Sequence, residues 1–253
     1  MIQMTERNSA AIDLRDIPPI RHAEAMRLAA TECDRFVNLV GRLETDDWVQ
    51  PTDCTEWSVK DIVIHQLGEA AAIGSIREMV HQMRAARTLP KTMARVDRLN
   101  AVHVRERRHL STNQLPELLA RTLQRALRAR RRIPALLRKI RFSDESFGRV
   151  SFGDLSDLVV TRDSLIHRLD ITRATGKPME VTAEHEGRIV AGVVREWAAR
   201  HGAAFSLRLT GPAGGLYQRG TGGEDFELDA LQFCRILSGR ARGNGLLTTQ
   251  VMF

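Results

Sequence analysis

Cysteine is scarce in this chain. Its 253 residues include three, Cys33, Cys54 and Cys234, and they are scattered along the sequence. An odd, widely spaced set does not build a disulfide framework and is typical of a protein in a reducing compartment. Proline, at eight residues, and glycine, at 18, are no more frequent than in ordinary globular proteins, which excludes a collagen-like or mainly disordered chain. We therefore predict a folded, cytoplasmic protein.

Long hydrophobic runs are also missing. No stretch of the sequence approaches the roughly 20 consecutive apolar residues that a transmembrane helix needs. Residues 1–16 are polar and mixed in charge, without the apolar core of a secretory signal. We therefore expect neither a membrane-spanning segment nor a membrane partner. The length suits one large domain or two smaller ones, and either can bury a hydrophobic core.

Aromatic residues are few, whereas positive charge is abundant. The formal net charge is +7, but residues 101–142 alone hold 12 Arg or Lys against two Glu. The rest of the chain has 26 basic and 29 acidic residues, so the excess is local. One tyrosine and three tryptophans provide few surfaces on which nucleic-acid bases could stack. The composition therefore argues against a nucleic-acid partner.

The basic stretch has two separate stripes at helical spacing. The apolar stripe consists of Leu119, Leu123, Ala126, Leu127, Ile133, Leu137 and Ile140. The basic stripe consists of Arg121, Arg125, Arg128 and Arg132. This pattern predicts an amphipathic helix with a solvated basic back. Attraction of an anionic ligand, an acidic partner or RNA is the alternative interpretation.

Hydrophobic residues recur at helical spacing through most of the first 176 residues. Ser58 and Asp61 have the form of a capping box, which predicts that a helix begins after Ser58. Pro134 is expected to kink or break the basic helix, and Gly176 with Pro178 to end the last helix of this region. The predicted segments are helices at 22–42, 59–86, 96–109 and 154–175, the basic helix, and a loop at 143–153.

The pattern changes near residue 177. Residues 182–201 predict one more helix, which ends at Gly202, and residues 205–209 alternate strictly between apolar and polar, as a half-buried strand does. Short strands at 216–219 and 226–228 and a helix capped by Asp229 complete the region. We therefore predict an α+β chain with two domains, a helical bundle at 1–176 and a small α/β domain at 177–253.

Common catalytic motifs are absent from the sequence. It has no Cys-x-x-Cys pair, no Gly-x-Ser-x-Gly elbow, no phosphate loop ending in Gly-Lys-Ser/Thr and no His-Glu-x-x-His. What remains is His65 and the pair Asp163 and His167, whose spacing of four residues puts both side chains on one helix face. Facing helices of a bundle could bring these residues together. Two imidazoles and a carboxylate would then bind a metal ion and leave one position open.

A simpler interpretation stands beside this metal site. An Asp–His pair at this spacing can form a local hydrogen bond on the surface, and a single helical histidine can be merely structural. The other histidines have polar neighbours or sit at helix ends, and we predict that they are surface residues: His22, His81, His103, His109, His185 and His201.

Three segments share a pattern with one known family. Residues 48–65 read WVQPTDCTEWSVKDIVIH, similar to a Trp and a Pro followed by Cys/Gly-x-x-Trp-Ser/Thr-Val-x-Asp-x-x-x-His. Residues 162–171 read RDSLIHRLDI, similar to Glu-x-x-x-His-x-x-Asp-Ile. Residues 229–240 read DALQFCRILSGR, similar to a closing segment that ends in Gly-Arg. In this order the segments resemble the mycothiol-dependent maleylpyruvate isomerase family of the DinB-like superfamily.

The resemblance implies a DinB-like, up-down helical bundle followed by a small sterol-carrier-like α/β domain. It also implies that His65, Asp163 and His167 bind a divalent metal, with zinc as the expected ion. At position 163 the family more often has Glu. The shorter Asp side chain must bring its helix closer to the metal, accept a bridging water or bind more weakly. The departure bears on metal affinity more than on where the site lies.

The family's chemistry implies an isomerase or S-transferase that uses mycothiol as a thiol cosubstrate. A metal-held thiolate would attack an electrophilic small molecule. Arg240 matches the arginine of the family's closing Gly-Arg, which implies a catalytic role, although a cationic cap at the end of a helix explains it equally well. A different hypothesis is a non-catalytic metal-binding or regulatory protein whose basic helix contacts an acidic partner or nucleic acid.

Overall fold

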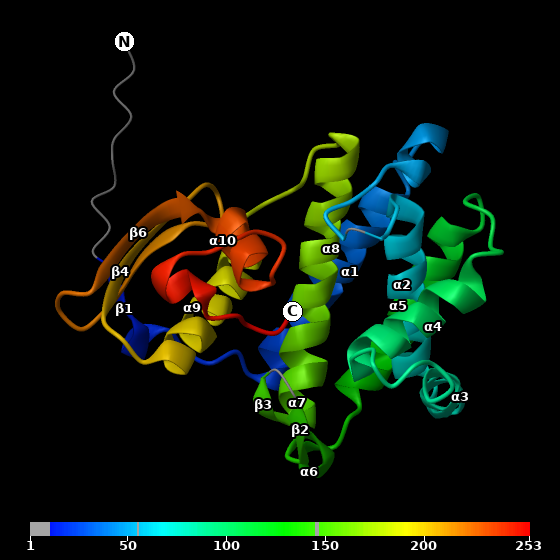
Figure 1. Cartoon of the computed structure of the whole chain (residues 1–253), viewed down its shortest axis with the longest axis horizontal. Coiled ribbons are helices and arrows are strands. Elements are labelled where there is room, and N and C mark those ends of the chain that lie inside the picture. Colours follow the sequence, from blue (N-terminus) through cyan, green and yellow to red (C-terminus); the bar gives the residue numbers. More distant parts are fainter. Residues whose placement is uncertain (1–10, 55, 145–146) are drawn as a thin grey trace. The chain divides into compact units, whose positions relative to one another are not determined.

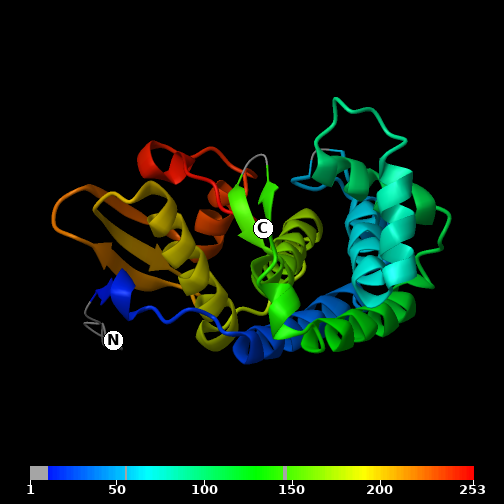
Figure 2. The same cartoon turned by 90° about the horizontal axis from the view of Figure 1, so that it is seen from below.

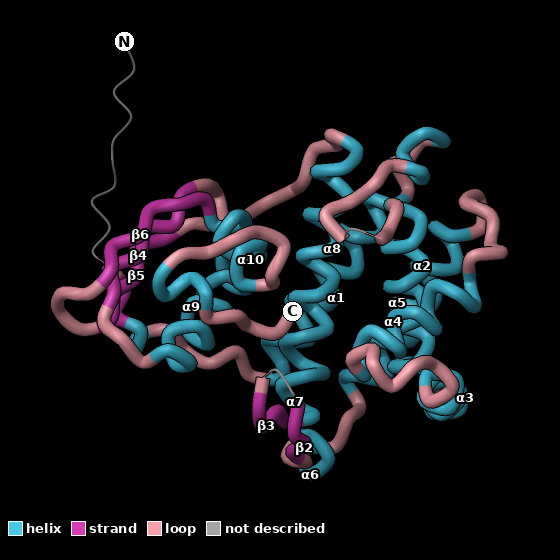
Figure 3. The backbone as a smooth tube through the Cα atoms, in the orientation of Figure 1, coloured by secondary structure: helices cyan, strands magenta, loops and turns pink. Residues whose placement is uncertain are grey.

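The computed structural model describes residues 11–54, 56–144 and 147–253. Over these residues the chain divides into two units. One comprises residues 21–180, and the other joins residues 11–20 to residues 181–252. The first is built mainly of helices and the second contains a sheet (Figures 1 and 3). The predicted α+β class, with a helical bundle before a sheet-containing region, is confirmed.

The bundle unit contains eight helices and one hairpin within the described residues. The helices are α1 (His22–Val40), α2 (Val59–Gly74), α3 (Ile76–Ala86), α4 (Arg95–Arg107), α5 (Leu115–Arg131), α6 (Ala135–Arg138), α7 (Phe152–Asp154) and α8 (Val160–Thr175). A π-helical segment, Leu155–Val159, runs directly into α8. The hairpin pairs β2 (Arg141–Asp144) with β3 (Gly148–Ser151).

Two details of the bundle differ from the sequence prediction. The segment predicted as one helix at 59–86 is two helices, because α2 ends at Gly74 and the hydroxyl of Ser75 caps the start of α3. Residues 143–153 are not a simple loop, since the antiparallel hairpin β2–β3 covers most of them. Both features depend on short polar segments that have no hydrophobic periodicity of their own.

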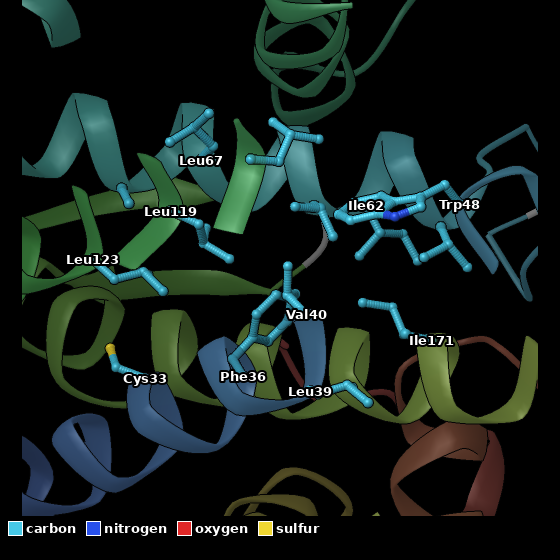
Figure 4. Packing of buried hydrophobic residues seen from close by; sticks show 14 of the residues in the cluster. Cys33, Phe36, Leu39, Val40, Trp48, Ile62, Leu67, Leu119, Leu123 and Ile171 are labelled. Carbon is cyan, nitrogen blue, oxygen red and sulfur yellow. The ribbon is translucent and has the colours of Figure 1, made fainter. Parts of the chain in front are cut away.

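The bundle core lies among α1, α2, α5 and α8 (Figure 4). Figure 2 shows α1 and α5 running side by side. The side chains that fill the space between these helices are almost completely buried: Phe36, Leu39, Val40, Ile62, Leu67, Leu119, Leu123 and Ile171. Trp48, from the short 3-10 turn Thr45–Val49 between α1 and α2, packs with them. Apolar stripes on separate helices thus meet in one core, which holds α2 against α8.

The amphipathic prediction for α5 is confirmed up to residue 132. Its apolar stripe is buried at Leu119, Leu123, Ala126 and Leu127, and its basic stripe is exposed at Arg121, Arg125, Arg128 and Arg132. The helix ends before Pro134, so the predicted break there is confirmed. Beyond it the apolar stripe no longer faces the core, because Leu137 and Ile140 are 45% and 55% exposed.

The second unit contains a mixed four-stranded sheet with the order β1-β5-β4-β6. Its elements are β1 (Ile12–Asp13), β4 (Phe205–Thr210), β5 (Gly215–Arg219), β6 (Glu224–Asp229), α9 (Arg188–His201) and α10 (Ala230–Leu237). β5 is antiparallel to β4, whereas β1 and β6 are parallel to their neighbours. Across the described parts of both units, no helix is long and apolar enough to cross a membrane.

One face of this sheet is covered by helices. Along β4 buried and exposed residues alternate, with Phe205, Leu207 and Leu209 turned inward. The ring of Trp197, from α9, lies 4.7 Å from that of Phe205 and 5.4 Å from that of Phe233 on α10. These aromatic contacts fasten α9 and α10 to the inner face. β4 is thus the half-buried strand that the alternation of residues 205–209 predicts.

Candidate metal centre

His65, Asp163 and His167 come together inside the bundle unit. His65 lies on α2, and the other two lie one turn apart on α8. His65 Nε2 is 3.4 Å from Asp163 Oδ2, and His167 Nε2 is 3.4 Å from Asp163 Oδ1. Both imidazoles are 3% exposed. The two predicted segments, 98 residues apart in sequence, therefore meet at one cluster.

The cluster has the donor set and spacing of a small metal site. One ligand atom from each residue lies within 4.8 Å of the other two. Two ligands bound at about 2.1 Å to a tetrahedral ion are themselves roughly 3.4 Å apart, and two His with one carboxylate is a common catalytic zinc set. The shorter Asp side chain still reaches both imidazoles. These residues therefore fit a divalent cation.

His167 has a second carboxylate on its other side. Its Nδ1 is 3.0 Å from Oδ2 of Asp170, which is fully buried. Cys54 Sγ donates to the same oxygen at 3.6 Å. A carboxylate behind a ligating imidazole fixes the tautomer and orientation of the ring. With Nδ1 occupied in this way, Nε2 of His167 is turned toward Asp163.

Asp163 is held by residues of α2 as well as by its own helix. The side-chain amide of Gln66 donates to Asp163 Oδ2, and the hydroxyl of Ser164 donates to Gln66 Oε1 at 2.8 Å. Gln66 directly follows His65, so the same turn of α2 supplies one imidazole and positions the carboxylate. The carboxylate is thereby oriented before any ligand arrives.

An aromatic ring lies against the two imidazoles. The ring centroid of Trp57 is 4.9 Å from that of His65 and 6.0 Å from that of His167. The loop that carries it is closed by a bridge between Pro51 and Ser58. Within this loop the backbone N–H of Trp57 donates to the carbonyl of Cys54 at 2.7 Å. One short loop therefore brings both Cys54 and Trp57 to the cluster.

The electrostatics of the cluster favour a bound cation. Burial alone would lower the pKa of His167, but the charge of Asp163 and the hydrogen bond to Asp170 outweigh it and raise that pKa to about 10. Loss of water around the partly buried Glu69, followed by the charge of Asp163, raises the pKa of that carboxyl to about 8. Without a metal, the cluster therefore retains protons, which a divalent cation would displace.

The prediction that His103 is a surface residue is wrong. Its ring is 6% exposed, and its Nδ1 lies 3.2 Å from Nδ1 of His65. Burial lowers the pKa of His103 to about 2, so its ring is neutral. His185, also predicted at the surface, is 4% exposed. His185 is flanked in sequence by two glutamates, whereas His103 is flanked by Val102 and Val104, which are buried with it.

Arg240 follows α10, in the other unit. Its backbone N–H donates to the carbonyl of Arg235 at 2.9 Å, just after Gly239, whose φ of 81° is in the left-handed region. This is the usual geometry of a helix end. The catalytic role of Arg240 stays a prediction that rests on the closing Gly-Arg of the sequence.

The supporting residues around the three candidate ligands were not predicted from sequence. Asp170 and Trp57 belong to segments already singled out, and their helical or loop positions near His167 and His65 offered a signal. Gln66 follows a candidate ligand directly. For His103 the flanking Val102 and Val104 indicate burial, but only the crossing of α4 over α2 brings its ring to His65.

Comparison with known proteins places this bundle in a family. Residues 29–172, more than half of the chain, match the family described as mycothiol maleylpyruvate isomerase N-terminal domain. The fold is similar to the crystal structures of the mycothiol-dependent maleylpyruvate isomerase and of a point mutant of it. Their TM-scores are 0.56 and 0.55 at 16% and 15% identity, each over 91% of this chain and 92% of the other. The chain matches no curated protein sequence. By the match to its bundle, the chain belongs to the mycothiol maleylpyruvate isomerase N-terminal domain family.

Proposed function

We propose that this chain is a metal-dependent enzyme that uses a low-molecular-weight thiol, mycothiol, to isomerise or conjugate an electrophilic small molecule. The observation that carries the proposal is the convergence of His65, Asp163 and His167 within 4.8 Å. Family membership supports it, because the structurally similar proteins are mycothiol-dependent maleylpyruvate isomerases.

The three side chains would provide three ligands and leave a further position for an exchangeable group. Nitrogen and oxygen donors in this ratio suit zinc, which we propose as the ion. A divalent cation bound there would stabilise the anionic form of a thiol at the open position. Asp170 would keep His167 oriented, and the ring of Trp57 would exclude water beside both imidazoles.

The thiolate would add to an electrophilic carbon of the substrate and form a C–S bond, while the π electrons of the double bond move onto the conjugated carbonyl oxygen. In an unsaturated dicarboxylate, the former double bond would then rotate. Return of those electrons would re-form the double bond and expel the thiolate, which gives the geometric isomer, whereas uptake of a proton at carbon would retain the C–S bond and give a conjugate. For a substrate with carboxylates we propose Arg240 as a receiving group, since the planar fork of arginine matches a carboxylate. Arg240→Ala should then lower turnover and leave metal content unchanged.

The test begins with metal content. Tag-free protein supplied with zinc and freed of excess should retain about one zinc per chain. His167→Ala should retain little, whereas His109→Ala, a change at an exposed histidine, should match the parent. Elemental analysis gives the metal content. If the parent retains no zinc, the proposal is overturned.

Turnover is the second part of the test. The zinc-loaded parent is incubated with mycothiol and either maleylpyruvate or a bimane electrophile, and product is followed by absorbance or fluorescence. We expect product formation that needs both zinc and mycothiol and is lost in His167→Ala. A zinc-bound protein that is inert toward both electrophiles would contradict the proposed enzymatic activity and favour a regulatory metal-binding protein. The exposed arginine stripe of α5 would then be the contact surface for a partner.

A further inference from the structure

A chain of hydrogen-bonded polar side chains leads from His65 into the bundle. It runs from His65 on α2 through His103 on α4 to Gln82 on α3. Gln82 Oε1 lies 2.9 Å from His103 Nε2, and His103 Nδ1 lies 3.2 Å from His65 Nδ1. All three residues are at most 6% exposed. Three helices are therefore linked behind one candidate ligand.

The amide orientation of Gln82 is set by its other partners. Its Nε2 donates to the carbonyl of Gly68 and to Oε1 of Glu78, each at 2.9 Å. Both partners are acceptors, so a flipped amide would place its oxygen against two oxygens. Oε1 must therefore face His103. His103 is buried, and its two ring nitrogens face an amide and an imidazole rather than a carboxylate, which favours the neutral ring. Because an amide oxygen accepts only, the proton of that ring lies on Nε2.

The position of that proton determines the proton position on His65. With Nε2 protonated, His103 Nδ1 has a free lone pair and can only accept. His65 Nδ1 must then donate to it, which leaves the lone pair of His65 on Nε2. That nitrogen is the one that lies 3.4 Å from Asp163 Oδ2. A lone pair that faces a carboxylate is repelled unless a proton or a metal cation lies between them.

The backbone of α2 is adapted to this arrangement at Gly68. A Cβ added there would lie 2.6 Å from Cβ of His103, closer than atoms can pack. Glycine therefore allows α4 to approach α2 closely enough for the two imidazoles to meet. The carbonyl of the same residue also accepts from Gln82. One residue thus serves both ends of the chain.

We propose that Gln82 and His103 are positioning residues that commit His65 to the tautomer with its Nε2 lone pair available for the metal. The inference rests on the proposed function, since it assigns a task to residues behind the proposed metal ligand. It adds two residues, on α3 and α4, that touch neither metal nor substrate. Their effect reaches the site only through the ring of His65.

The direction of the chain can be read by nitrogen NMR of histidine side chains. In both the metal-free and zinc-loaded protein, His103 should be the neutral tautomer protonated at Nε2. In the zinc-loaded protein, His65 should carry its proton on Nδ1. A proton on His103 Nδ1, or on both of its nitrogens, would overturn the proposal. The metal-free measurement reports on the chain even if the protein binds no zinc, so failure of the proposed function is distinguishable.

Metal affinity is the second measurement, made by competition with a chelator. Loss of a partner behind a ligating imidazole typically costs 10- to 100-fold in affinity. We expect a loss in this range for His103→Leu and about tenfold for Gln82→Met, which has similar length but no acceptor. His103→Gln, which again offers an acceptor, should recover part of the affinity. His81→Leu, at the exposed neighbour of Gln82, should match the parent.

Each variant is first checked for its fold by circular dichroism and thermal unfolding. If His103→Leu is folded and binds zinc as tightly as the parent, the proposal is wrong. If His103→Leu does not fold, Gln82→Met decides in its place. Weaker zinc binding in Gln82→Met, together with a mixture of His103 tautomers, supports the proposal. Unchanged zinc affinity with an unchanged tautomer contradicts it.

Discussion

At the scale of the residue, Asp163 is the centre of the site. Its carboxylate lies 3.4 Å from each of the two imidazoles and accepts a hydrogen bond from Gln66, so it is the one group that links all three candidate ligands. Its negative charge is also a main reason why the pKa of His167 is raised. The side chain therefore combines two separable properties, a position suited to a metal ligand and a negative charge beside His167.

Asp163→Asn separates charge from shape. The amide keeps the size of the side chain but removes the charge that holds a proton on His167. In the metal-free variant we expect the pKa of His167 to fall well below its value of about 10. An NMR titration of the imidazole measures it, with Asp97→Asn on the exposed side of α4 as the control. An unchanged titration midpoint would show that the charge of Asp163 does not act on His167.

Glu69→Gln should change how stability depends on pH. The pKa of Glu69 is raised in the folded protein from 4.5 to about 8. Below pH 4.5 the carboxyl is protonated in both the folded and the unfolded chain. Between pH 4.5 and 8 it ionises only in the unfolded chain, so the parent loses stability as pH rises. The variant has no such group. Its free energy of unfolding should therefore exceed that of the parent by an amount that grows across this window to a few kcal/mol, at about 1.4 kcal/mol per pKa unit.

Urea unfolding of metal-free protein at several pH values measures this difference. Glu117→Gln, at a side chain 76% exposed on α5, provides the baseline. A stability difference between Glu69→Gln and the parent that stays constant from pH 5 to pH 8 would rule out a raised pKa for Glu69.

Prediction from sequence reached the centre of the site but not its surroundings. His65, Asp163 and His167 could be selected because helical spacing and apolar neighbours indicate which side chains turn inward. His103 also has apolar neighbours, Val102 and Val104, but the prediction did not use them. Its burial follows from the missing side chain at Gly68, which lets two helices approach. Such an approach depends on a partner far away in sequence, so no local pattern announces it.

At the scale of the element, α2 does the most for the site. It supplies His65 and Gln66, and its first turn follows the loop that holds Trp57. Its start is defined by a capping box, in which Ser58 Oγ accepts from the N–H of Asp61 at 3.3 Å and the Asp61 carboxylate accepts from the N–H of Ser58 at 3.1 Å. The sequence predicted this cap correctly, because a capping box is a purely local interaction.

Ser58→Ala should therefore destabilise the bundle by about 1 kcal/mol, the usual value for an N-cap. Urea unfolding measures the free energy of unfolding. Ser143→Ala, at an exposed position in β2, should change it by no more than about 0.5 kcal/mol. Equal effects of the two changes would mean that the cap contributes nothing to stability.

The boundaries of elements were harder to predict than their existence. The break between α2 and α3 falls at Gly74 and Ser75, where the cap of the second helix competes with continuation of the first. Nothing in the apolar periodicity of residues 59–86 marks that competition. The hairpin β2–β3 was missed because its strands are largely exposed and show no alternation.

At the scale of the whole molecule, the three thiols lie in different surroundings. Cys33 and Cys234 are buried, whereas Cys54 is partly exposed beside the candidate metal centre. Burial raises the pKa of Cys33 to about 11, so at pH 8 very little of it is the reactive thiolate. The folded chain should therefore react with thiol reagents at Cys54 first.

Iodoacetamide labelling at pH 8, followed by mass spectrometry of peptides, tests this order. We expect one rapid modification at Cys54 and slow ones at Cys33 and Cys234. Protein unfolded in urea should label at all three sites at similar rates. Rapid labelling of Cys33 in the folded protein would show that the core around α1 opens readily.

The pairing of β1 with β5 has a consequence for the order of events during synthesis. Ile12 lies beside Tyr217 in the sheet, so the second unit combines residues 11–20 with residues 181–252. A ribosome delivers residues 21–180 between these two parts. The bundle can complete its core while residues 11–20 still await their neighbouring strand. The sheet can therefore close only after residues 215–229 have been made, later than the core of the bundle.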